Sequence, residues 1–249
     1  MKNRWLTLLF ALCTICLLFC SCSSSNSAGN PSVNHSEPAE SKIEDIIGDW
    51  YGTTEVHSDR NEGTFTAVLS INPDGHWASC VNGSVNSGTW EASSDSTNRL
   101  ILTVEYKGGN FTNTWSFEKK TDGKYYYNYV YGESIPISVT KMETESAEQL
   151  LGDWQGNTIH TFEDGEEKQF DASLSINADL SWSSSVNGSN NAGHWDYISE
   201  AGHLVVLTVE YSGGTLTNTW AFTKDDSGQY HYEYVHGEAI RIPVVNLSQ

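Results

Sequence analysis

The tripeptide Gly48-Asp49-Trp50 recurs as Gly152-Asp153-Trp154, 104 residues later, and four further stretches recur behind it. These are residues 69–72 (LSIN) and 174–177, 81–84 (VNGS) and 186–189, 102–106 (LTVEY) and 207–211, and 112–115 (TNTW) and 217–220. All four pairs are offset by 105 residues, so the register holds with a single one-residue insertion. Such a repeat predicts two domains of one fold, which we place at residues 43–143 and 147–249.

Each copy has the pattern of an antiparallel meander. Alternating runs are separated by turn pairs such as Asn82-Gly83, in which positive φ is tolerated. Eight consecutive strands with short connections most simply close into an up-and-down barrel, because closure removes exposed edges. The predicted fold class is all-β, with two small tandem eight-stranded barrels. In the first copy we expect strands at residues 50–56, 64–72, 76–81, 88–92, 99–106, 111–118, 124–131 and 134–140.

Charge and cysteine content exclude several kinds of function. The 249 residues include 13 Lys plus Arg and 32 Asp plus Glu, a formal charge of −19. A field of this sign repels phosphate backbones, so we expect no nucleic-acid partner. Beyond residue 22 the sequence has one cysteine, Cys80, which excludes a disulfide framework or a cysteine metal site there. Because Ser185 replaces it in the second copy, a shared catalytic thiol is not expected either. We expect no metal or other cofactor.

The N-terminus predicts export. Two basic residues precede an apolar run over residues 5–19, and Cys20 and Cys22 follow. Cys22 comes after the small residue Ser21 and resembles the lipid-modified cysteine of the bacterial lipobox. Cys20 and a plain secreted protein remain the alternatives.

We therefore expect a lipoprotein signal peptide at residues 1–21, lipidation of Cys22 and a flexible tether over residues 22–42, which are rich in Ser, Asn, Gly and Pro. The acyl chains would hold the protein at a bacterial cell membrane or outer surface, outside the cytoplasm, without any basic surface.

The Gly-x-Trp start of each copy resembles the first strand of lipocalins. The whole chain resembles the small lipocalin-like domains of bacterial lipoproteins. The resemblance implies structural positions for Gly48, Trp50, Gly152 and Trp154. In that family the Trp closes one barrel end beneath a late basic residue, here Lys141 or Arg241.

Period-two alternation predicts the inner faces of the strands. Phe65, Ala67, Leu69 and Ile71 share one face and are expected in the core. On the sixth strand an asparagine, Asn113 or its counterpart Asn218, falls among apolar neighbours. A buried amide must find a partner in the backbone, water or a ligand. The seventh strand places four aromatic rings on one face, which either line a cavity or form a ladder that only stabilises the barrel.

The favoured function is non-catalytic binding of a small amphipathic or carbohydrate ligand. The candidate contacts are the aromatic and amide positions of the sixth and seventh strands: Asn113, Trp115, Tyr127, Tyr129 and Tyr131 in copy one, and Asn218, Trp220, Tyr232, Tyr234 and His236 in copy two. A structural or adhesive protein with filled barrels is one alternative. A hydrolase is the other, but no Gly-x-Ser-x-Gly motif or repeated carboxylate pair supports it, and no catalytic residue is assigned.

Overall fold

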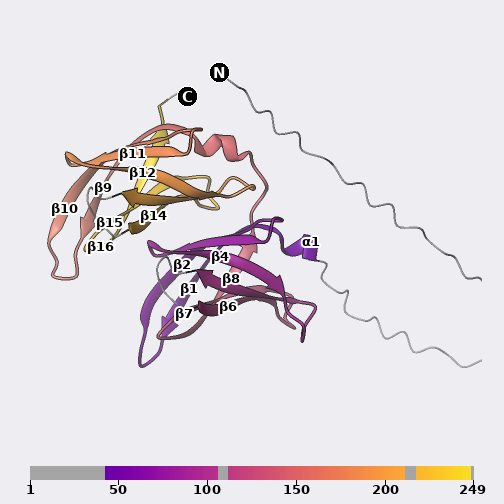
Figure 1. The fold of residues 1–249 in the computed structure, drawn as a ribbon. Coiled ribbons are helices and arrows are strands. Elements are labelled where there is room, and N and C mark those ends of the chain that lie inside the picture. Colours follow the sequence, from indigo (N-terminus) through magenta and orange to yellow (C-terminus); the bar gives the residue numbers. More distant parts are fainter. Residues whose placement is uncertain (1–42, 106–111, 211–216, 248–249) are drawn as a thin grey trace, which may run out of the picture. The chain divides into compact units, whose positions relative to one another are not determined.

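The computed structural model describes residues 43–105, 112–210 and 217–247. They form two closed antiparallel barrels of eight strands each, which confirms the predicted fold class (Figure 1). The predicted signal peptide, Cys22 and tether lie outside the described residues. Within the described residues, no helix has the length and apolar character needed to span a membrane.

Barrel 1 contains strands β1 to β8, each hydrogen-bonded to the next, with β8 returning to β1. A short helix, α1 (Ile43–Ile46), precedes it. The strands are β1 (Gly48–His57), β2 (Glu62–Ile71), β3 (His76–Val81), β4 (Ser84–Ala92), β5 (Arg99–Glu105), β6 (Thr112–Lys119), β7 (Tyr125–Tyr131) and β8 (Glu133–Lys141).

Barrel 2 repeats this order. A 3-10 helix, η1 (Ala147–Leu150), replaces α1. The strands are β9 (Gly152–Thr161), β10 (Glu167–Ile176), β11 (Ser181–Val186), β12 (Ser189–Ile198), β13 (Leu204–Glu210), β14 (Thr217–Lys224), β15 (Tyr230–His236) and β16 (Glu238–Asn246).

The β3–β4 turn shows how local sequence sets the register. Asn82 and Gly83 have φ of 46° and 78°, values that favour Asn and Gly, and their counterparts in barrel 2 have 49° and 81°. Val81 therefore pairs directly with Ser84. As a result β4 begins at Ser84, earlier than the expected residue 88.

Barrel closure depends on one glycine in each copy. A Cβ atom on Gly52 would lie 2.0 Å from the carbonyl oxygen of Ser138, and one on Gly156 would lie 1.9 Å from that of Pro243. The first and last strands of each barrel approach too closely for any side chain at these points. The glycine that allows the sheet to close therefore lies two residues after the Trp of each Gly-Asp-Trp repeat.

Both barrel interiors are filled. Trp77, Leu102, Phe117 and Tyr127 of barrel 1 are all 0% exposed. Leu207, Phe222, Tyr232 and Ile242 are likewise 0% exposed in barrel 2. These inner side chains are therefore in contact with one another on all sides, and the barrels are packed cores rather than hollow cups. The expected core residues Ala67, Leu69 and Ile71 are buried, and Phe65 is half-buried.

The Trp of the repeat closes one barrel end. The indole of Trp50 donates to the carbonyl oxygen of Ile46 at 2.9 Å, and the Lys141 ammonium lies 5.7 Å from its ring. In barrel 2 the residue paired with Trp154 is Asn246. Arg241 was therefore the wrong candidate for the basic partner: it lies earlier on the same strand, β16, and its Nε atom is 3.2 Å from Glu233 of β15.

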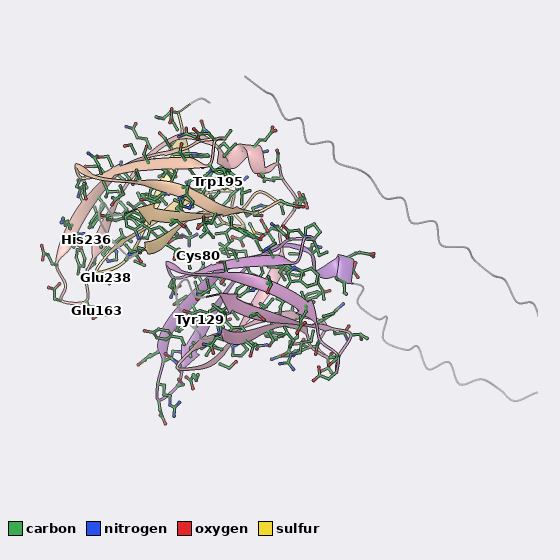
Figure 2. All side chains as sticks on the ribbon, viewed as in Figure 1. Cys80, Tyr129, Glu163, Trp195, His236 and Glu238 are labelled. Atoms are coloured by element: carbon green, nitrogen blue, oxygen red, sulfur yellow. The ribbon has the colours of Figure 1, made fainter. Side chains whose placement is uncertain are left out.

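The described residues belong to one compact unit, within which the barrels contact each other through their outer faces. Val68, Ala78 and Cys80 on β2 and β3 pack against Leu204, Val206 and Ala221 on β13 and β14. Figure 2 shows Cys80 on this side of barrel 1. All six side chains are at most 3% exposed, and burial raises the pKa of the Cys80 thiol well above its usual value.

Candidate functional site

A column of aromatic rings fills barrel 1 from the middle to one end. The rings of Trp77 and Trp115 are 5.7 Å apart, those of Trp115 and Tyr129 are 5.2 Å apart, and Tyr129 stacks on Tyr131 at 6.4 Å with an interplanar angle of 8°. Alternation along β7 produces the column, because Tyr127, Tyr129 and Tyr131 all point to the same side. The column ends where β1 turns into β2, which we call the hairpin end.

Barrel 2 repeats the column with one substitution. The rings of Trp182 and Trp220 are 5.9 Å apart, and those of Trp220 and Tyr234 are 5.1 Å apart. The last member is His236, which stacks on Tyr234 at 6.2 Å and 14° in the place that Tyr131 takes in barrel 1. The hairpin end of barrel 2 is the β9–β10 turn.

Hydrogen bonds fix the buried tyrosines inside the columns. The Tyr127 hydroxyl lies 2.8 Å from Ser79 Oγ, and the Tyr232 hydroxyl lies 2.8 Å from Ser184 Oγ. Burial raises the pKa of Tyr127 well above its ordinary value. These hydroxyls are satisfied within the barrel, so they are not exposed to a ligand in solution.

The predicted contact residues divide into buried and exposed groups. Trp115, Tyr127, Tyr129, Trp220, Tyr232 and Tyr234 are all at most 5% exposed. Asn113, Tyr131, Asn218 and His236 are exposed. The expected burial of Asn113 and Asn218 is wrong, because both amides lie at the hairpin end of the sixth strand of their barrel, where the inner face meets solvent.

At the hairpin end of barrel 1, apolar rings adjoin a carboxylate. Phe65 lies 6.3 Å from Tyr129 and 6.4 Å from Tyr131, which is 61% exposed. Glu133, paired with Tyr131 across the β7–β8 turn, accepts hydrogen bonds from Ser58 and from Asn61 Nδ2. The bond from Ser58 and then that from Asn61 lower the pKa of Glu133.

The hairpin end of barrel 2 has the same plan with different residues. His160 packs edge-on against Phe162 at 4.9 Å and Phe170 at 6.4 Å. Its Nε2 atom lies 3.4 Å from Oε1 of Glu238, the counterpart of Glu133. Figure 2 shows His236, Glu238 and Glu163 at this end of the barrel. In barrel 2, His160 contacts the carboxylate of Glu238. In barrel 1, the Ser58 hydroxyl and the Asn61 amide bind the equivalent carboxylate of Glu133.

The sequence analysis missed His160, Phe162 and the paired glutamates as members of this site. Alternation along β9 placed His160 on the inner face, so the signal was present. What the sequence did not show was that Glu133 and Glu238 begin the last strand directly opposite the exposed aromatic residue.

The two histidines of β15, His231 and His236, lie on opposite faces of the sheet, because their positions differ by an odd number of residues. His231 bonds to Asp225 at 2.9 Å, whereas His236 stacks in the column. Among the described residues, no group of three His, Cys, Asp or Glu side chains is arranged to hold a metal ion.

Comparison with known proteins adds little to this geometry. No protein-family model matches the chain, and no curated protein matches it. One solved structure with some similarity is a protein of unknown function from the DUF3598 family of Nostoc punctiforme. It is 11% identical, and the match covers 80% of this chain and 94% of that chain with a TM-score of 0.25. A TM-score this low supports no inference about fold or function.

Proposed function

We propose that this protein is a non-catalytic binding protein of the bacterial cell envelope, anchored through an acylated Cys22. Its two lipocalin-like barrels present small binding surfaces for an amphipathic or carbohydrate ligand at their hairpin ends. The observation that carries the proposal is that an exposed aromatic residue ends each aromatic column. Tyr131 is 61% exposed although it stacks on a buried ring, and His236 repeats this arrangement.

Exposed rings over a rigid base suit ligand binding. An aromatic face attracts the C–H face of a sugar or an alkyl chain, and the packed column beneath holds the ring in place without further loss of side-chain entropy. Asn113 or Asn218 and the nearby carboxylate supply hydrogen-bonding groups to orient such a ligand. The filled interior means that the ligand sits on the barrel end and not inside the barrel.

The barrel end opposite the hairpin end supports the lipocalin-like assignment. Trp50 lies between α1 and Lys141, as the Gly-x-Trp resemblance implies. The anchor is supported by the apolar run that ends at Cys20 and Cys22. Metabolic labelling with palmitate tests the anchor: Cys22→Ala should abolish the label, and Cys20→Ala should retain it. Label lost in Cys20→Ala and retained in Cys22→Ala assigns the lipid to Cys20, and absence of label from the wild-type protein contradicts the anchor.

Binding at the hairpin ends is tested by tryptophan fluorescence. We expect a saturable change with one class in a panel of fatty acids and oligosaccharides, and at least a tenfold weaker Kd for Tyr131→Ala combined with His236→Ala. Tyr126→Ala is the matched control, because Tyr126 lies on the same sheet with its ring on the outer side, bonded to Asp122. A ligand that binds the double variant as tightly as the wild type contradicts this site.

A structural or adhesive role is the second candidate, and the filled barrels favour it. A protein that only spaces or joins other proteins needs rigid bodies and no cavity. Absence of any fluorescence response, together with specific retention of an envelope protein by the chain, would replace the ligand-binding proposal with this one.

A further inference from the structure

A shallow hollow lies on the outer face of barrel 2, away from the aromatic column. Its volume is about 660 Å³, within the range of about 300–1,000 Å³ usual for small-molecule sites. Outward side chains of β9, β10 and the β11–β12 turn region form most of it: Gln155, Asn157, Asp171, Ser173, Ser185 and Asn187. A second hollow of about 630 Å³ shares Ser173 and Ser185 with the first, so the two are continuous across β10 and β11.

Most of the polar side chains that line this hollow are neutral amides and hydroxyls. Among the described residues that line the first hollow, Asp171 is the one charged side chain, and no basic or aromatic residue contributes. Gln155 and Asn157 are exposed and make no side-chain hydrogen bond to another described residue. Each amide offers two N–H donors and an acceptor oxygen. At the edge, Val245 presents an apolar surface that is 62% exposed.

The same face of barrel 1 is occupied. Thr66, Val68, Cys80 and Asn82 are the counterparts of Asp171, Ser173, Ser185 and Asn187, and they line a cavity that Glu233, Ala239 and Arg241 of barrel 2 close. The approach is tight at the turn: a Cβ atom on Gly83 would lie 2.2 Å from that of Ala239. At Gly188, the counterpart of Gly83, such an atom would meet nothing within 4 Å. Barrel 1 therefore uses this face to contact barrel 2, whereas none of the described residues covers the equivalent face of barrel 2 at Gly188.

The substitutions between the copies indicate what the open face binds. Tyr51, Val68 and Cys80 become Gln155, Ser173 and Ser185, so the apolar groups that a protein interface needs at its centre are gone. Hydroxyls and amides replace them over one continuous surface. A ligand that matches them carries many neutral hydroxyl groups.

We propose that the outer face of barrel 2 is a binding site for a neutral oligosaccharide. The amides of Gln155 and Asn157 bind sugar hydroxyls, the serines of β10 and β11 lie beneath the chain, and Val245 contacts a C–H face. The two continuous hollows accommodate more than one sugar unit. The negative field of the chain and Asp171 disfavour acidic glycans. This site is separate from the hairpin ends and does not depend on ligand binding there.

The test is isothermal titration of the purified full-length chain, held in detergent, with gluco-, manno-, galacto- and xylo-hexaoses. We expect saturable binding of at least one hexaose. Gln155→Ala combined with Asn157→Ala should weaken its Kd at least tenfold. A second variant, Gln155→Tyr with Ser173→Val, installs the barrel 1 residues on the same backbone and should weaken binding to the same extent.

Three comparisons make the outcome specific. Tyr126→Ala should leave hexaose affinity unchanged, because its ring lies on the outer side of barrel 1, bonded to Asp122 and away from both proposed sites. The hairpin-end variant, Tyr131→Ala with His236→Ala, distinguishes this face from the hairpin ends. Hexagalacturonate, an acidic hexaose, should bind at least tenfold more weakly than the best neutral one. Failure of every neutral hexaose to bind, or affinity retained in both face variants, overturns the proposal. Loss of affinity in the hairpin-end variant alone assigns the sugar to the hairpin ends and also overturns it.

Discussion

Asp49 of barrel 1 accepts a hydrogen bond from His203 Nδ1 of barrel 2 at 3.0 Å, across 154 residues of sequence. The same carboxylate oxygen accepts the backbone N–H of His203, also at 3.0 Å, and the Ser199 hydroxyl. Asp49 and His203 are 0% and 3% exposed. The counterpart of Asp49 in the second copy, Asp153, is exposed and bonds to Ser175 of its own barrel. The aspartate of the first Gly-Asp-Trp sequence, Asp49, therefore forms hydrogen bonds between the barrels, whereas Asp153 of the second bonds within its own barrel.

The contrast between these aspartates gives the first prediction. Asp49→Ala leaves the ring and backbone N–H of His203 and the Ser199 hydroxyl buried without their acceptor. Because an unsatisfied buried polar group costs about 1–3 kcal/mol, we expect the free energy of unfolding to fall by about 3–5 kcal/mol. Asp153→Ala should cost less than about 1 kcal/mol, because its bond is exposed. Urea unfolding followed by tryptophan fluorescence measures both. If the free energy of unfolding falls as little in Asp49→Ala as in Asp153→Ala, the Asp49 contact does not stabilise the pairing of the barrels.

The barrel interior gives the second prediction. Tyr127→Phe removes the hydroxyl that bonds Ser79 and leaves that serine buried without its partner, which should cost about 1–3 kcal/mol. Tyr131→Phe is the control, because its ring is 61% exposed, and we expect a change below about 0.5 kcal/mol. Thermal and urea unfolding compare the two. A stability of Tyr127→Phe equal to that of the wild type would contradict the packed interior.

Closure gives the third prediction. Gly52→Ala places a Cβ atom 2.0 Å from the Ser138 carbonyl oxygen, so β1 and β8 must separate. We expect loss of the cooperative unfolding transition of barrel 1, and the same for barrel 2 in Gly156→Ala. Thr53→Ala, at the next position of β1, should fold normally. Hydrogen exchange resolved by barrel reports which one opens. Native protection in Gly52→Ala would show that the strands can shift to admit a methyl group.

The fourth prediction concerns pH. Burial raises the pKa of Glu233 above its ordinary value of 4.5, while Arg241 and the hydrogen bond from Thr223 act in the opposite direction. The folded state therefore holds this proton more tightly than the unfolded chain, and stability from Glu233 falls as pH rises from about 4.5 through the raised pKa. In Glu233→Gln this dependence is absent.

The measurement for Glu233 is the free energy of unfolding from pH 4.5 to pH 7.5. The value for the wild type minus that for Glu233→Gln should decrease steadily as the pH rises. Parallel curves for the two proteins would mean that the folded and unfolded states bind the proton equally well.

The strand order and barrel closure could be predicted because each copy carries the local signals independently. Asn-Gly turns occur twice, and alternation on β2 and β5 identifies one apolar face in each case. Two copies that agree reduce the chance that a pattern is accidental. The expected strand at residues 76–81 coincides with β3.

The contacts that join distant residues could not be predicted in this way. Asn113 alternates with buried rings, but it lies where the strand leaves the core, and the alternation of residues does not indicate how far the core extends. Asp49 and His203 gave no signal at all, because their pairing depends on how two finished barrels meet. The differences between Val68 and Ser173, and between Cys80 and Ser185, did indicate which outer face makes the contact between the barrels. An outer face that is apolar in one copy and polar in the other is the expected mark of a contact made by one copy alone.

The contact between the barrels joins unlike faces, β2 and β3 of one to β13 and β14 of the other. A head-to-tail contact of this kind would repeat without end if both copies carried both faces. Two sets of substitutions prevent such repetition. On barrel 2, Ser173 and Ser185 replace the apolar residues of the open face. On barrel 1, Arg99 and Ser116 occupy the positions of Leu204 and Ala221 in barrel 2. The tandem is therefore a finite assembly with a fixed order, and exchanging the two barrels along the chain would bring two polar faces together and leave two apolar faces free to polymerise.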